Sequence, residues 1–214
     1  MPYINRKSEY TIFAKRIGLA GTAQTVASLK GLVIIPILTR TLGAADYGIW
    51  ALILITISFL LPLMLFGMDS AILRFLSLKG KEDIVQGVIT AFLVIFLVGM
   101  VASIIIFLSS NFLAVTILKE ESAVSIIRIA SPLVLLNALN NMATGSFRIF
   151  GQIKRYSAVL LLQSFLEVGL IAFFVFSGDG LIGAIISLLI TWTFLLVVKL
   201  FLIISYAGFN FPDF

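Results

Sequence analysis

Side chains capable of binding and proton chemistry occur in this sequence inside long apolar stretches. In the fourth stretch they recur at helical spacing and share about 100° of arc on one helix face: Asn137, Asn140, Asn141, Thr144 and Arg148. Gln24 and Lys30 stand in the first stretch, and Gln163 and Glu167 share one face of the fifth. Amides can bind hydroxyl groups, cations can bind anions, and a carboxyl group can carry a proton or a cation.

The residues that most enzymes need are missing. The chain has no cysteine and no histidine, which removes thiolate nucleophiles, imidazole bases and the usual zinc ligands. It has no Gly-x-Ser-x-Gly elbow, no phosphate-cradling loop and no pair of carboxylates at an exposed site. We therefore expect that the protein is not an enzyme and binds no cofactor or metal.

The polar residues are carried by six apolar stretches, at roughly 17–38, 47–68, 85–109, 122–147, 156–177 and 180–206. Each has the ~20 residues that a helix needs to cross a bilayer. Hydrophobic residues make up 61% of the chain and charged residues 12%, which excludes a soluble globular protein. The sequence predicts an all-α, polytopic membrane helix bundle of six transmembrane helices, forming one domain over 1–214. The short connections, such as 39–46 and 109–121, make successive helices antiparallel neighbours.

Basic residues in the connections are unequally divided between the two sides of the membrane. One side holds ten: Arg6, Lys7, Lys15, Arg16, Arg74, Lys79, Lys81, Arg148, Lys154 and Arg155. The other side holds two, Arg40 and Lys119. The positive-inside rule places the first side, and both termini, in the cytoplasm. We expect the lipid bilayer of the cytoplasmic membrane as a partner and no nucleic acid, because the basic residues form no contiguous patch.

Lys30 and Glu167 are predicted to lie at similar depths, about 20 and 16 Å from the inner boundary at ~1.5 Å per residue. An isolated charge near the centre of a span costs ~2.5–3.5 kcal/mol on insertion scales. We hypothesise that the two side chains meet or share one hydrated network. The alternative is that each pairs separately with asparagine or with backbone carbonyls.

Other polar residues have simpler explanations beside a functional one. The polar face of the fourth stretch either lines a hydrated cavity, which we favour, or supplies hydrogen bonds between helices. Arg128 and Lys199 lie near helix ends, so we expect their charged groups to reach the lipid headgroups. Residues 70–78 predict a short amphipathic helix on the cytoplasmic face with Arg74 at the headgroups. Trp192 is either an interface anchor or a packing residue.

Three segments carry a family resemblance: LTRTLGAADYGIWAL at 38–52, GMDSAILRF at 67–75 and GSFRIFGQIKRYSA at 145–158. They resemble the signatures of polysaccharide and O-antigen flippases of the multidrug/oligosaccharidyl-lipid/polysaccharide (MOP) exporter superfamily. In the third segment Ile149 replaces the small residue that usually follows the arginine. Members of that family have two pseudo-symmetric lobes, and this chain is similar to the N-terminal lobe alone.

The resemblance implies a transporter lobe that flips a polyprenyl-diphosphate-linked oligosaccharide across the cytoplasmic membrane by alternating access. The expected substrate cavity comprises Gln24, Lys30, Asn137, Asn140, Asn141, Thr144, Arg148 and Gln163. Arg74 would contact the diphosphate or headgroups, and Glu167 would carry the coupling proton or ion. A second copy or a separate C-terminal lobe is the expected partner. The alternatives are a multidrug or cation antiporter of the same superfamily, or a membrane scaffold or assembly subunit that does not transport.

Overall fold

The computed structural model describes residues 6–68, 71 and 81–207, and all regular structure within them is helical. This confirms the all-α prediction. In chain order the elements are α1 (Arg6–Leu65), α3 (Lys81–Leu108), α4 (Ser110–Phe112), the π-helix η1 (Leu113–Leu118), α5 (Ala123–Ala130), α6 (Pro132–Ile149), α7 (Ile153–Phe176) and α8 (Gly180–Ala207). Arg74 and, apart from Ala71, the predicted amphipathic helix at 70–78 lie outside the described residues.

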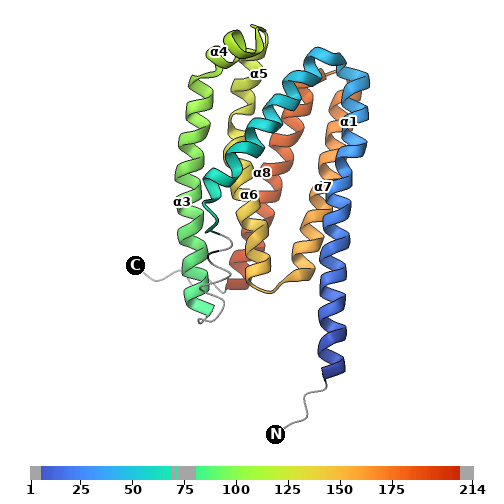
Figure 1. The fold of residues 1–214 in the computed structure, drawn as a ribbon, viewed down its shortest axis with the longest axis vertical. Coiled ribbons are helices and arrows are strands. Elements are labelled where there is room, and N and C mark those ends of the chain that lie inside the picture. Colours follow the sequence, from blue (N-terminus) through green and yellow to red (C-terminus); the bar gives the residue numbers. More distant parts are fainter. Residues whose placement is uncertain (1–5, 69–70, 72–80, 208–214) are drawn as a thin grey trace.

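Helix α1 consists of two arms joined at a sharp bend. Gly43 has φ 76° and ψ 177°, a conformation that is essentially restricted to glycine, and the helix resumes directly after it. The first arm, residues 6–42, runs up one side of the bundle, and the second, residues 44–65, descends across its front (Figure 1). The predicted connection at 39–46 was therefore wrong, because one residue without a β-carbon reverses the chain and both flanks stay helical.

The predicted helix at 122–147 is two helices. Pro132 has no backbone N–H and begins α6, while α5 ends at Ala130, so the break falls at Ser131. The segment 109–121, which was predicted to be a connection, instead contains the helices α4 and η1. Helix η1 ends at Leu118, and the next residue, Lys119, has φ 54°. Hydrophobicity placed the span correctly but could not show the break within it.

Within the described residues, five helical segments are long and apolar enough to cross a membrane: Ile17–Leu65, Glu82–Leu108, Ala123–Ile149, Ile153–Phe176 and Gly180–Tyr206. The first contains both arms of α1. Large apolar side chains are exposed on four of them, for example Phe59, Leu97 and Phe201, as expected for surfaces in lipid, whereas Ala123–Ile149 exposes none of its large apolar side chains. The protein is therefore an all-α, multi-pass membrane helix bundle.

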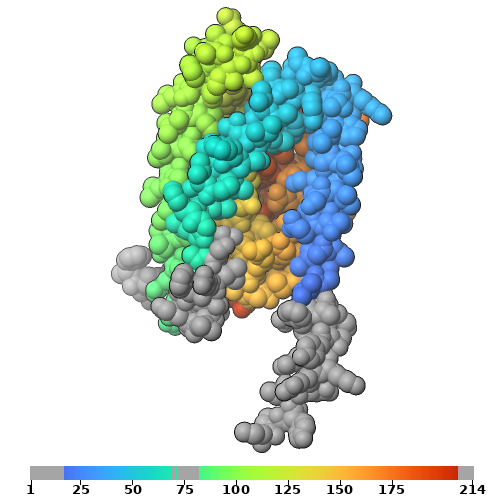
Figure 2. Space-filling view, in the orientation of Figure 1, coloured from blue at the N-terminus to red at the C-terminus, as the bar shows by residue number. Residues whose placement is uncertain are grey.

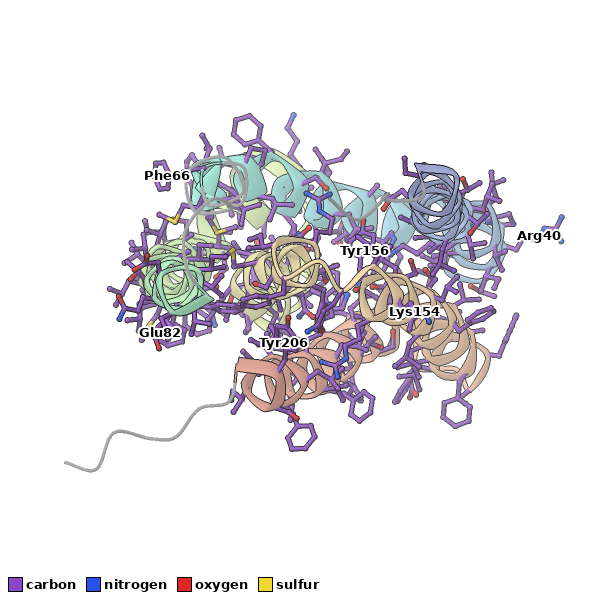
Figure 3. The ribbon with its side chains drawn as sticks, turned by 90° about the horizontal axis from the view of Figure 1, so that it is seen from below. Arg40, Phe66, Glu82, Lys154, Tyr156 and Tyr206 are labelled. Carbon is purple, nitrogen blue, oxygen red and sulfur yellow. The ribbon has the colours of Figure 1, made fainter. Side chains whose placement is uncertain are left out.

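Helix α6 lies in the middle of the bundle. It packs against α3 and α8, while α7 packs against α1 and α8. Seen from below, α6 is surrounded by the other helices, and Arg40 points outward from α1 (Figure 3). A close approach fixes α3 on α6, because a β-carbon at Gly99 would lie 2.8 Å from Leu135 Cδ1 and 3.4 Å from its Cα. Buried side chains on α6 are consequently candidates for contact with three neighbouring helices.

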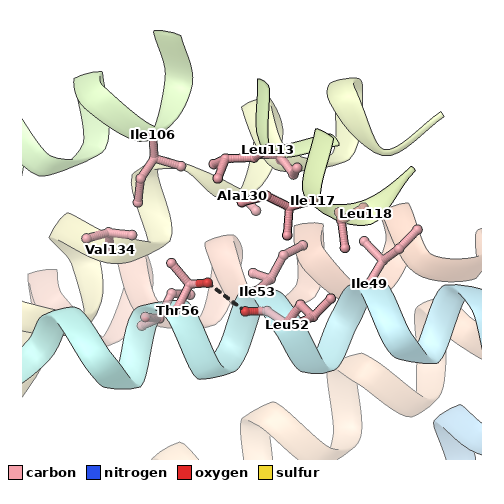
Figure 4. Close-up of a pocket in the computed structure, with 12 residues that line it drawn as sticks. Ile49, Leu52, Ile53, Thr56, Ile106, Leu113, Ile117, Leu118, Ala130 and Val134 are labelled. Carbon is pink, nitrogen blue, oxygen red and sulfur yellow. Dashed lines mark hydrogen bonds between the residues drawn. The ribbon is translucent and has the colours of Figure 1, made fainter. Parts of the chain in front are cut away.

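A pocket of about 130 Å³ lies between the second arm of α1 and the helices α3, η1, α5 and α6 (Figure 4). Its lining is aliphatic except for Thr56, whose hydroxyl donates to the carbonyl of Leu52 at 2.8 Å. No free polar group faces this space. The charged side chains that the structure buries, Glu167 and Lys199, do not line this pocket.

Candidate functional site: a buried polar network beside a cleft

The centre of the site is the carboxylate of Glu167 on α7, whose side chain is 3% exposed. Its Oε2 accepts a hydrogen bond from Lys30 Nζ on the first arm of α1, and the two residues form a salt bridge. Its Oε1 accepts from Gln163 Nε2 at 2.8 Å and from Trp192 Nε1 at 2.7 Å. The hypothesis that Lys30 and Glu167 meet is confirmed, although they are 137 residues apart in sequence.

A second cation, Lys199 on α8, is fully buried at 0% exposure. Its Nζ donates to Asn140 Oδ1 at 2.8 Å and to Gln163 Oε1 at 3.1 Å, with the Asn140 carbonyl at 3.5 Å. The prediction that Lys199 reaches the headgroups was wrong. Asn140 on α6 and Gln163 on α7 accept the hydrogen bonds that the ammonium group would otherwise donate to water at the helix end.

Gln163 connects the two charged centres. Its amide nitrogen donates to Glu167 while its amide oxygen accepts from Lys199. The chain of contacts thus runs Lys30, Glu167, Gln163, Lys199, Asn140, and it joins the first arm of α1 to α7, α8 and α6. With all three charged groups ionised, the network holds two cations and one anion, which leaves one excess positive charge.

The polar face predicted on the fourth stretch divides between the interior and the surface of the bundle. Asn140 is 3% exposed, and its amide nitrogen donates at 2.9 Å to the carbonyls of Leu136 and Trp192. Asn141 is exposed and donates to Asn137 Oδ1 at 2.9 Å. Asn140 therefore faces α8, whereas Asn141 lies where a ligand or a neighbouring lobe could reach it.

The remaining predicted residues lie outside the chain of contacts that joins the charged groups. The hydroxyl of Tyr156 donates to Gln24 Oε1 at 3.2 Å, which gives α7 a second polar contact with the first arm of α1. Figure 3 shows Tyr156 inside the bundle. Arg148 is exposed, with its guanidinium carbon 5.8 Å from the centre of the Tyr156 ring. Thr144 is half-buried and donates to the carbonyl of Asn140 at 2.8 Å.

A cleft of about 340 Å³ opens between the two arms of α1 and is closed behind by α7 and α8. Figure 2 shows the hollow between the arms. Lys30 and Glu167 supply its charged groups, and Tyr47, Trp50 and Trp192 supply aromatic walls. Because the Lys30 side chain remains 31% exposed while Glu167 is covered, the network presents a cation to the cleft.

Sequence reasoning missed two members of the network, Lys199 and Trp192. A signal for Lys199 was present, because α8 carries a buried row at four-residue spacing: Ser187, Thr191, Leu195 and Lys199. Polar residues at helical spacing with a lysine indicate an inward-facing polar stripe. Trp192 gave no comparable signal, since a tryptophan in an apolar run is typical of packing.

A sequence model of the family described as polysaccharide biosynthesis protein matches residues 37–210. The chain belongs to this family. That confirms the resemblance seen in the three segments of the sequence. No curated protein matches the chain.

Two solved structures have the same fold as this polysaccharide biosynthesis family member. One is described as a MOP superfamily transporter from Pyrococcus furiosus with reverse polarity of the binding pocket; it has a TM-score of 0.76, 20% identity, and coverage of 90% of this chain and 44% of that one. The other is an outward-facing multidrug resistance MATE family transporter of the MOP superfamily, with a TM-score of 0.69, 19% identity, and coverage of 88% and 43%. The chain thus spans less than half the length of either structure.

The two solved structures with this fold are described as membrane transporters and not as enzymes. This agrees with the expectation drawn from the sequence and assigns the chain to the MOP transporter fold, of which it represents about one lobe.

Proposed function

We propose that this chain is one lobe of a flippase that moves a polyprenyl-diphosphate-linked oligosaccharide across the cytoplasmic membrane by alternating access. The observation that carries the proposal is the network of two lysines, Lys30 and Lys199, and one carboxylate, Glu167, which borders an open cleft and presents Lys30 to it. A charged side chain inside a bilayer is energetically costly, so a lysine at that depth indicates a functional site. Binding of an anionic substrate is a function that requires such a cation. Membership of a polysaccharide biosynthesis family supports the choice of substrate.

The proposed topology has six crossings, with residues 1–214 forming one transmembrane domain and both termini in the cytoplasm. Each arm of α1 within the candidate span exceeds the ~20 residues needed to cross, and the arms run in opposite directions (Figure 1). In the sequence, the segments assigned to the cytoplasmic side carry ten basic residues and the opposite connections carry two, Arg40 and Lys119. This excess supports the proposed orientation.

Different residues suit different parts of such a substrate. Lys30, together with Arg148 and the Arg74 expected from the sequence, suits the diphosphate, because cations form charge-assisted hydrogen bonds with phosphate oxygens. Amides suit sugar hydroxyls through paired donors and acceptors, and Gln24, Asn137, Asn141 and Gln163 are proposed for this role, with Thr144 as a hydroxyl. Asn140, which was expected in the cavity, is 3% exposed and engages α8 and Lys199, so it is proposed to hold the network together and not to contact the sugar. Glu167 is proposed to carry the coupling proton or cation between conformations.

The transport path is proposed to form between this lobe and a second one, either another copy of this chain or a separate C-terminal lobe. The lengths support this arrangement, since the chain covers 44% and 43% of the two transporters with the same fold. Asn141 and Gln24 are exposed here and would line the space between the lobes.

The test is flipping of a fluorescent lipid-linked oligosaccharide in proteoliposomes that contain the assembled transporter. We expect Lys30→Gln and Arg148→Gln to reduce the flipping rate at least tenfold, while Arg40→Gln, an exposed cation on the same arm as Lys30, leaves it unchanged. Flipping that tolerates Ala at Lys30, Arg148 and Glu167 together would refute the cavity assignment. Efflux of cationic drugs without saccharide flipping would instead identify the antiporter alternative, and assembly without any transport would identify the scaffold.

A further inference from the structure

We propose that the Lys30–Glu167 ion pair is exchangeable: a phosphate-class anion in the cleft takes Lys30 from Glu167, and Lys199 then serves as the counter-cation of the released carboxylate. This inference rests on the proposed function and specifies how its anionic group is bound. It assigns a role to Lys199, which is fully buried and does not line the cleft, so a ligand in the cleft would not contact it. Lys199 is thus a positioning residue.

The two lysines of the network differ in access. Lys30 has 31% of its side chain exposed and lines the cleft together with Glu167. Lys199 is 0% exposed, and its acceptors are amide and carbonyl oxygens of Asn140 and Gln163, none of which is charged. An incoming anion can therefore reach Lys30 but not Lys199.

The carboxylate of Glu167 retains support when Lys30 leaves. Its Oε1 still accepts from Gln163 at 2.8 Å and from Trp192 at 2.7 Å. Gln163 simultaneously accepts from Lys199 at 3.1 Å, so its amide dipole is aligned between the ammonium group and the carboxylate. Among the buried side chains that the structure describes, Glu167 and Lys199 are the charged ones, and together they are neutral.

This arrangement makes the exchange balanced in charge. Before exchange, Lys30 is paired with Glu167 and Lys199 is the excess cation. After exchange, Glu167 and Lys199 compensate each other, and Lys30 pairs with the anion in the cleft. A buried carboxylate that lost its sole cation would carry a large penalty, and the second lysine removes that penalty. The exchange therefore requires two lysines, one to bind the anion and one to compensate the charge of Glu167.

The cleft also provides a direct reporter. The protein has two tryptophans, Trp50 and Trp192, and both line the cleft. Trp192 donates to the carboxylate that changes partner. Binding of a phosphate-class anion beside Lys30 should therefore change the intrinsic tryptophan fluorescence.

The experiment titrates the purified full chain in nanodiscs of neutral lipid with inorganic pyrophosphate and follows that fluorescence. We expect saturable binding that Arg40→Gln preserves and Lys30→Gln weakens about tenfold or more. Lys199→Gln, which keeps a hydrogen-bond donor but loses the charge, should weaken binding about tenfold when Glu167 is present. In a Glu167→Gln background the same Lys199 change should have no effect, because no released carboxylate then needs a counter-cation.

The double variant Glu167→Gln/Lys199→Gln keeps Lys30 as the one charge of the network. It tests the inference even if the Glu167→Gln variant does not fold. It should bind pyrophosphate at least as tightly as the unmodified protein. Equal binding by the Lys30→Gln variant would overturn the inference, as would weaker binding by the double variant. A merely structural Lys199 would weaken binding in both backgrounds.

A second arm separates a soluble from a lipid source of the phosphate group, using nanodiscs with and without phosphatidic acid. A Lys30-dependent fluorescence change with pyrophosphate or with phosphatidic acid supports the exchange, and the probe that causes it identifies the source. If neither probe causes such a change, the exchange is refuted. Flipping of lipid-linked saccharide is measured separately. Loss of flipping in Lys30→Gln without anion exchange would leave the proposed function standing and remove only this inference.

Discussion

Replacing Glu167 by Gln should destabilise the protein more than replacing either lysine of the network. The substitution leaves Lys30 and Lys199 without a carboxylate, whereas removal of one lysine leaves a neutral pair. Glu167 accepts from Lys30, Gln163 and Trp192. A hydrogen bond to a charged group contributes about 1.5–3 kcal/mol and a neutral one about 1 kcal/mol, so three weakened bonds amount to about 3 kcal/mol. That agrees with the 3–5 kcal/mol typical of breaking a buried ion pair.

The assay is reversible unfolding in mixed micelles of increasing SDS content, followed by tryptophan fluorescence because the chain has no cysteine for thiol dyes. We expect a loss of about 3 kcal/mol in the free energy of unfolding for Glu167→Gln, and clearly smaller losses for Lys30→Gln and Lys199→Gln. Adding Lys30→Gln to Glu167→Gln should restore part of the stability, because one uncompensated cation is removed. Glu121→Gln, at an exposed acid, is the control. If Glu167→Gln were no less stable than the lysine variants, the charge argument would be wrong.

Three further predictions concern the bend, the helix contact and the polar face. Gly43→Ala should cost ~1–3 kcal/mol in the same unfolding assay because φ is 76° and ψ 177°, while Gly169→Ala, within α7 with nothing within 4 Å of its new β-carbon, should be neutral or stabilising. Gly99→Ala should cost ~1–3 kcal/mol because its β-carbon would meet Leu135 at 2.8 Å; no loss would show that α3 and α6 separate easily. A cysteine at Asn141 should react with a water-soluble maleimide in intact membranes, whereas one at Asn140, 3% exposed, should react only after unfolding; the reverse order would contradict the orientation of α6.

Much of the fold followed from the sequence, because the thickness of a bilayer fixes the length of an apolar helix. The predicted stretches at 85–109, 156–177 and 180–206 correspond to spans at Glu82–Leu108, Ile153–Phe176 and Gly180–Tyr206. The bend at Gly43 was not predicted, since apolar content reports burial in lipid and not backbone direction. A connection was expected around it, and a single glycine sufficed.

The site was predicted in part, and the missing part has a physical cause. Depth along a helix can be counted at ~1.5 Å per residue, which is why Lys30 could be matched with Glu167. Rotation about the helix axis is set by packing against neighbours, and it decides whether a lysine faces lipid or protein. The row of Ser187, Thr191 and Lys199 on α8 could have indicated that Lys199 faces inward, but its acceptor Asn140 is 59 residues away, so the partner required the three-dimensional arrangement.

The sequence separation of the ion pair has a consequence for biogenesis. Lys30 enters the translocon long before Glu167 has been synthesised, since 137 residues at ~5–20 residues per second correspond to roughly 7–27 s. During that interval the nascent hairpin formed by the two arms of α1 must hold an ammonium group in the membrane without its carboxylate, at ~2.5–3.5 kcal/mol against insertion. The aliphatic residues around Lys30 offset this insertion cost during synthesis. Insertion of the hairpin and the later formation of its ion pair with α7 are therefore separate events.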